Sequence, residues 1–171
     1  MHFIVDVLAF SLIVYTCTLA GFAVANGYAE RPRQLRDLLT GLEMLRTEIV
    51  YAATPLAAAL TSLRLRHPIG KFFLCAGEGI DALATARSAW VTALDALSRD
   101  AALLEGDLAA LRYLGDVLGT SNREDQERHL LVAIRRIEAL QREAEEEAKR
   151  SARLWKYLGV LSGITVVIII M

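Results

Sequence analysis

Hydrophobic residues dominate both ends of the chain, and charged residues are confined to the section between them. Residues 7–29 and 157–171 contain no charged side chain, and of the 19 basic and 20 acidic residues only Asp6 lies outside 30–156. A helix over the first run would be about 34 Å long at ~1.5 Å per residue, enough to cross a hydrocarbon core of roughly 30 Å. The pattern predicts two transmembrane helices, 4–29 and 154–171, around a central domain, 30–153.

The second hydrophobic run is too short to cross a bilayer by itself, because 157–171 would be only about 22 Å long as a helix. Leu154 and Trp155 lengthen it, and the Lys156 amine can extend to the interface. Tyr157 follows directly. Trp155, Lys156 and Tyr157 together are therefore predicted to form an interfacial belt.

Basic residues predict the orientation of the two spans. The central domain begins with Arg31, Arg33 and Arg36 and ends with Lys149, Arg150, Arg153 and Lys156, whereas neither outer end contains Lys or Arg. Basic residues near a span are retained on the cytoplasmic side, so both flanks place the central domain in the cytoplasm. The competing interpretation is a cleaved signal peptide, for which Ala23-Val24-Ala25 offers small residues. That interpretation is disfavoured because no basic residue precedes the run and the run exceeds the usual ~7–15 residues.

The central domain has the periodicity of an all-α bundle of six antiparallel helices. Leu35, Leu38, Leu42, Leu45 and Ile49 alternate at spacings of three and four, which is a helical core stripe. This helix is expected to end near residue 53. Further helices are predicted over about 55–65, 69–76 (broken by Gly77 and Gly79), 83–97 and 104–118, and a sixth begins at a Ser121–Glu124 capping box and continues unbroken into the second span. The predicted core includes Leu38, Leu42, Leu45, Trp90, Leu111 and Ile137.

Thr54 and Pro55 are expected to be the N-cap and first residue of the second helix.

Two charged clusters could take part in interactions with lipid or with a partner protein. Arg31, Arg33 and Arg36 could set topology alone, tether the domain to anionic lipid, or pair with carboxylates of a partner. The acidic section that contains Glu143 and Glu146 could be a solvated connector or an acidic docking surface.

Small residues in the two hydrophobic runs predict close helix packing within the bilayer. Gly159 and Gly163 form a GxxxG pair in the second run, and Gly21 with Ala25 forms a weaker pair in the first. Such residues let helix backbones approach closely.

Composition and motifs argue against several function classes. A net charge of −1 gives no case for binding nucleic acid. Cys17 and Cys75 lie in different parts of the chain, so no disulfide framework is expected. No zinc, phosphate-loop or nucleophile motif occurs, so the sequence predicts no enzyme, no cofactor and no metal site.

Several segments in order resemble the stage III sporulation protein AB family. They are Glu30-Arg31-Pro32-Arg33-Gln34-Leu35-Arg36, Tyr51 with Thr54-Pro55-Leu56, Trp90 with Ala93-Leu94, Leu114-Gly115 to Leu118-Gly119, Asp125-Gln126 with His129-Leu130, and Tyr157-Leu158-Gly159 with Gly163. The resemblance covers essentially the whole chain. No single segment is decisive, but their order and spacing are specific.

The resemblance implies a function that the residues alone do not give. Members of the family belong to the mother-cell side of a channel-like complex between mother cell and forespore, in the membrane that surrounds the forespore. Their helical domain is similar to that of the platform proteins of type II secretion and type IV pilus systems. The implied role is a non-enzymatic membrane scaffold that couples a cytoplasmic ATPase to the channel.

The implied partners are an ATPase like stage III sporulation protein AA, other membrane components of the channel, and membrane lipids. The oligomeric state stays open, including a homo-oligomer. The alternative function is a membrane-anchored helical adaptor for signalling or assembly unrelated to secretion.

Overall fold

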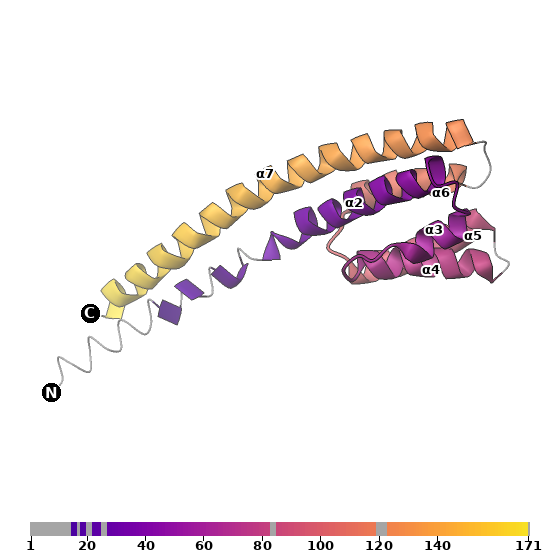
Figure 1. Cartoon of the computed structure of the whole chain (residues 1–171). Helices are drawn as coiled ribbons and strands as arrows, with labels where there is room; N and C mark the ends of the chain where they lie inside the picture. The colour runs from indigo at the N-terminus through magenta and orange to yellow at the C-terminus, as the bar shows by residue number, and fades with distance from the viewer. Residues whose placement is uncertain are drawn as a thin grey trace. The chain divides into compact units, whose positions relative to one another are not determined.

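The protein is all-helical wherever its structure is described. The computed structural model describes residues 15, 16, 18, 19, 22–24, 27–82, 85–118 and 123–170. Over these residues there is no strand, so the predicted all-α class is confirmed. The longer helices in Figure 1 are α2 (Glu30–Val50), α3 (Leu56–Ser62), α4 (Ile69–Asp81), α5 (Ala86–Asp100), α6 (Glu105–Val117) and α7 (Arg123–Ile170).

The chain divides into two compact units, which share helix α7. We call Arg31–Arg142 the bundle unit, and Met1–Glu30 with Glu143–Met171 the terminal unit. In the bundle unit, α4 packs against both α3 and α5, and α5 packs against α6. In Figure 1, α3, α4 and α5 lie together on one side of α2.

The core of the bundle unit is built from the leucine stripe of α2 and from aromatic residues of α4 and α5. Phe72 and Phe73 of α4 lie against Trp90 of α5, with the Phe72 and Trp90 ring centroids 4.8 Å apart at a near-perpendicular angle. Such edge-to-face pairs add to the stabilisation that burial provides. The six residues predicted for the core are each at most 1% exposed: Leu38, Leu42, Leu45, Trp90, Leu111 and Ile137.

The glycines of α4 permit close packing, and the prediction that they break the helix was wrong. Helix α4 continues through Gly77 and Gly79 to Asp81. A Cβ at Gly77 would lie 2.6 Å from Thr61 Cγ2, and one at Gly79 would lie 2.8 Å from the Cβ of Ala89. Helix α4 can pack this closely against α3 and α5 because glycine has no side chain at these two positions. Glycine within a helix costs roughly 0.5–1 kcal/mol per residue, and the close packing offsets that cost.

Helix ends differ from the expected ones in detail. Helix α2 ends at Val50, and Ala53 adopts a left-handed backbone with φ of 54°. The prediction of Thr54 as N-cap and Pro55 as first residue was wrong, because Pro55 is the N-cap and α3 begins at Leu56. The Thr54 hydroxyl instead donates to Glu48 Oε2 at 2.7 Å. Thr85 caps α5 by accepting from the Ser88 amide. Helix α6 ends at Val117, one residue before the predicted end. Ser121, the first residue of the predicted capping box, falls outside the described residues.

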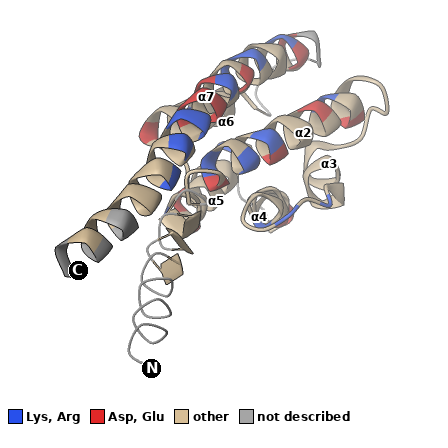
Figure 2. Ribbon diagram, turned by 90° about the vertical axis from the view of Figure 1, so that its left-hand side faces the viewer, with Lys and Arg blue, Asp and Glu red and all other residues tan. Residues whose placement is uncertain are grey.

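Helix α7 is a single helix of 48 residues, in agreement with the unbroken sixth helix that the sequence predicts. Charged side chains occur along it up to Lys156 and none follow. In Figure 2 the blue and red of the charged residues accordingly give way to tan toward the C-terminus. Among the described residues, no helix combines the length and apolarity needed to cross a membrane. That finding supports neither predicted span. The predicted span 4–29 lies largely outside the described residues.

Candidate interaction sites

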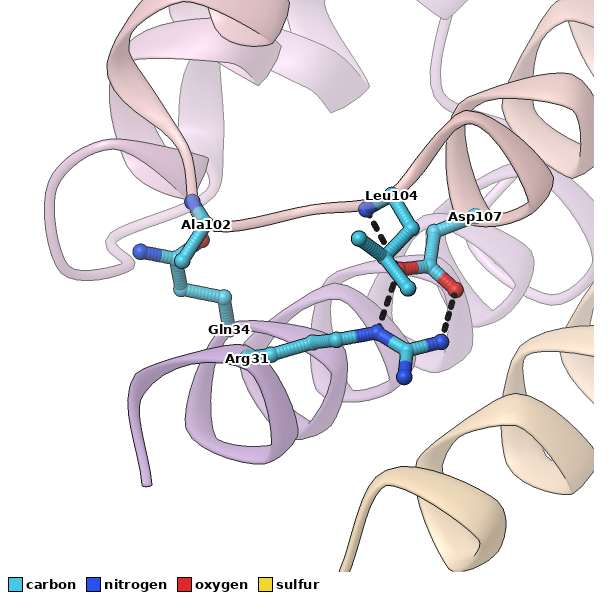
Figure 3. Close-up of polar contacts among 5 residues, drawn as sticks. All are labelled: Arg31, Gln34, Ala102, Leu104 and Asp107. Atoms are coloured by element: carbon cyan, nitrogen blue, oxygen red, sulfur yellow. Dashed lines mark hydrogen bonds and ion pairs between the residues drawn. The ribbon is translucent and has the colours of Figure 1, made fainter. Parts of the chain in front are cut away.

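A buried ion pair fastens the start of α2 to the start of α6. The Arg31 guanidinium donates from Nε to Asp107 Oδ2 at 2.9 Å and from Nη2 to Oδ1 at 3.0 Å (Figure 3). The Asp107 side chain is completely buried and that of Arg31 is 15% exposed. Two parallel hydrogen bonds between planar charged groups fix both distance and orientation, so this contact sets the register of the two helices.

The same carboxylate also holds the N-terminal turn of α6. Asp107 Oδ2 accepts a hydrogen bond from the Leu104 amide at 2.9 Å, one of the amides that a helix start leaves without an intrahelical partner. A negative charge in this first turn is further stabilised by the helix dipole. Nearby, Gln34 Oε1 accepts from the Ala102 amide at 2.7 Å. We call Arg31, Gln34, Ala102, Leu104 and Asp107 the α2–α6 clasp.

The three arginines that are close together in the sequence, Arg31, Arg33 and Arg36, have different surroundings in the structure. Arg31 is directed into the protein, whereas Arg33 and Arg36 are exposed. Each of the two exposed residues also makes a polar or ionic contact of its own. Sequence reasoning missed Asp107, although its position three residues after the expected helix start is typical of a capping carboxylate.

A second ion pair joins α2 to α7 within the bundle unit. Arg46 Nη2 lies 2.6 Å from Glu127 Oε1, and both side chains are 31% exposed. The hydrogen bond that Arg46 donates to Glu127 raises the pKa of the Arg46 guanidinium above its ordinary value.

In the terminal unit, the residues of the predicted interfacial belt contact aromatic residues from the N-terminal part of the chain. Trp155 Nε1 donates to the Tyr28 hydroxyl at 3.3 Å, and the Lys156 amine lies 5.0 Å from the centre of the Phe22 ring. Tyr157 is 65% exposed. These contacts bring the end of the first hydrophobic run beside the start of the second, a pairing that the sequence alone did not give.

The remaining predicted residues lie as follows. Glu143 and Glu146 are exposed on α7, and Glu146 borders a surface groove of about 370 Å³ together with Lys149, Arg150, Arg153, Leu154 and Tyr157. Gly159 is buried and Gly163 lies on α7, while Gly21 and Ala25 fall outside the described residues. The described part of the chain holds no group of three His, Cys, Asp or Glu side chains that could bind a metal ion.

Comparisons with known proteins agree with one another. The family model for stage III sporulation protein AB matches residues 6–171. Stage III sporulation protein AB of Bacillus subtilis (strain 168) is 31% identical over 162 residues, which cover 93% of this chain and 95% of that protein. A solved structure of a stage III sporulation protein AB is 30% identical, covers 70% of this chain and 97% of its own, and has a TM-score of 0.66. The chain therefore belongs to the stage III sporulation protein AB family, and it is a sporulation protein.

Proposed function

We propose that the chain is a non-enzymatic platform of a membrane channel required for endospore formation. Two hydrophobic segments, 4–29 and 154–171, anchor it, and the bundle unit lies in the cytoplasm of the mother cell. There it couples an ATPase like stage III sporulation protein AA to the other membrane components of the channel. The uncharged runs at both ends and the basic residues beside them support the anchoring and the orientation.

The continuity of α7 is the observation that carries this proposal. Its residues Leu130 and Ile137 belong to the core of the bundle unit, and the same helix continues past Lys156 into the uncharged C-terminal run. A displacement of the bundle caused by a bound partner would be passed along one hydrogen-bonded backbone, without a loop that could absorb it. Such a link suits a protein that transmits movement between a cytoplasmic motor and a membrane assembly.

The charges of the bundle unit favour a scaffold over an enzyme. Asp107 is the one buried charged residue within the described part of the chain, and both of its oxygens are used by the clasp. No buried polar side-chain atom there lacks a hydrogen-bond partner. Catalytic acids and bases are usually found where burial and charge are left uncompensated, so the buried polar groups fit a structural role.

The experiment is direct binding of the full-length chain, purified in a mild detergent, to the purified companion ATPase. We expect saturable binding that an unrelated helical membrane protein does not show. Lack of binding to the ATPase, with sporulation still dependent on the chain, would favour the alternative of a membrane-anchored adaptor. ATP hydrolysis by the chain alone would contradict the non-enzymatic role.

A further inference from the structure

An apolar groove of about 290 Å³ lies between α6 and α7 on the surface of the bundle unit. Its α6 side is formed by the small residues Gly106, Ala109 and Ala110, and a Cβ added at Gly106 would meet no atom within 4 Å. Tyr113 of α6 and Val132 of α7 border the groove, and each is 51% exposed. Large exposed apolar side chains beside an unfilled depression are typical of a surface that binds a side chain of a partner protein.

The charge along the α7 side of this groove is positive. Arg136 borders the groove and Arg135 is its neighbour, and both are exposed. Neither forms an ion pair with any residue that the structure describes. Several charged residues of α6 and of the start of α7 already have partners, in the pairs Glu105–Arg112, Asp116–Arg87 and Asp125–Arg128. Arg135 and Arg136 therefore have no acidic partner among the described residues and can bind a carboxylate of another protein.

We propose that this groove, which we call the α6–α7 groove, binds an amphipathic helix of a partner protein. A large apolar side chain of that helix enters above Gly106, and carboxylates on its flank pair with Arg135 and Arg136. Small residues let a third helix approach two others at the usual 8–10 Å between axes. Arginine binds carboxylates through two parallel hydrogen bonds, which gives the contact both strength and orientation. The proposal does not depend on the ATPase-coupling role, because any acidic amphipathic helix meets its requirements.

The test uses a photo-crosslinking residue, benzoylphenylalanine, in place of Tyr113 in the full-length chain of sporulating cells. The matched control places the same residue at Tyr51, another tyrosine that is exposed (73%) and lies outside the groove. We expect position 113 to capture a protein segment that position 51 does not. Mass spectrometry of the product should identify a helix-forming segment with acidic residues beside its apolar face.

Two variants of the same chain test the two halves of the proposed contact. Arg135→Glu with Arg136→Glu should lower the yield of the crosslink about tenfold or more, because the partner's carboxylates would meet like charge. Arg64→Glu with Arg66→Glu, at exposed positions between α3 and α4, is the control for the same change in net charge. Gly106→Leu fills the groove and should also lower the yield, while the open space at Gly106 lets the bundle fold.

Several outcomes would overturn the proposal. They are a crosslink to a second copy of this chain, a crosslink to lipid, an equal yield at position 51, the absence of any product, and a yield that the charge reversal leaves unchanged. Binding of the Arg135→Glu, Arg136→Glu chain to the companion ATPase, measured separately, distinguishes failure of this groove from failure of the proposed function.

Discussion

Asp107 accepts three hydrogen bonds, two from Arg31 and one from the Leu104 amide, while being fully buried. Asp107→Ala should lower the free energy of unfolding by about 3–5 kcal/mol, because it leaves the Arg31 charge largely buried without a counter-charge. Urea unfolding followed by circular dichroism measures this change.

The control for Asp107 is Glu105 in the same helix turn. Glu105 pairs with Arg112 at 3.0 Å, but both side chains are well exposed. Exposed pairs contribute about 0–1 kcal/mol, so Glu105→Ala should have a small effect. Similar losses for the two variants would mean that the clasp contributes no more than a surface ion pair.

Two glycines of α6 offer the same substitution in opposite surroundings. A Cβ at Gly115 would lie 2.2 Å from Trp90 Cδ1, whereas a Cβ at Gly106 would meet nothing within 4 Å. Gly115→Ala should therefore displace the indole and weaken the hydrogen bond from Trp90 Nε1 to the Leu111 carbonyl, now 2.8 Å. We expect a loss of about 1–3 kcal/mol and a changed tryptophan fluorescence spectrum.

Gly106→Ala should instead stabilise the protein by about 0.5–1 kcal/mol, because alanine restricts the unfolded chain and favours the helix. Thermal unfolding of both variants compares them directly. A stable Gly115→Ala protein with an unchanged fluorescence spectrum would show that α6 and α5 can separate at no cost.

The spacing of apolar residues is sufficient to predict the helices but not their contacts. The stripe from Leu35 to Ile49 predicts α2 because only a helix brings such positions to one face. The sequence predicts a break at Gly77, because one sequence does not show whether a glycine ends a helix or packs against a neighbouring helix. Asp107 and Arg31 are 76 residues apart, so no local pattern relates them. The α6–α7 groove likewise forms between residues of two different helices, which no local pattern relates.

Helix α7 allows a test of whether its continuity matters for function. Ala148 lies between the part of α7 in the bundle core and the uncharged C-terminal run. Ala148→Pro removes a main-chain hydrogen bond and places the ring against the preceding turn, at a cost of about 3 kcal/mol to the helix at that point. Ala148 lies outside the bundle unit, so the free energy of unfolding of that unit should change little. Sporulation, in contrast, should fail.

Ala148→Ser is the control, because it keeps the amide and the helix. Sporulation efficiency and the cellular amount of the protein are measured for both variants. Normal sporulation with Ala148→Pro at normal abundance would show that the unbroken helix is not needed to transmit movement.

The proposed orientation of the full chain in the membrane rests on basic residues at two separate places in the sequence. Arg31 is engaged by Asp107 in the folded protein, yet it still counts toward orientation, because retention of basic residues acts while the chain is being inserted. The second cluster, from Lys149 to Lys156, points to the same side independently. Neutralising Arg33 and Arg36 should therefore leave the topology unchanged.

Reporter fusions test this orientation. A reporter inserted between Leu63 and Pro68, in the connection between α3 and α4, should be active only as a cytoplasmic protein, and reporters at the two ends of the chain should report the opposite face. The mass of the mature chain is measured in parallel, because cleavage after the first hydrophobic run would shorten it and carry the bundle unit across the membrane. A shortened chain with an external signal from the α3–α4 connection would contradict both the anchoring and the contact with a cytoplasmic ATPase. A chain of full mass with a cytoplasmic signal places the bundle unit, including the clasp and the α6–α7 groove, where such an ATPase could reach it.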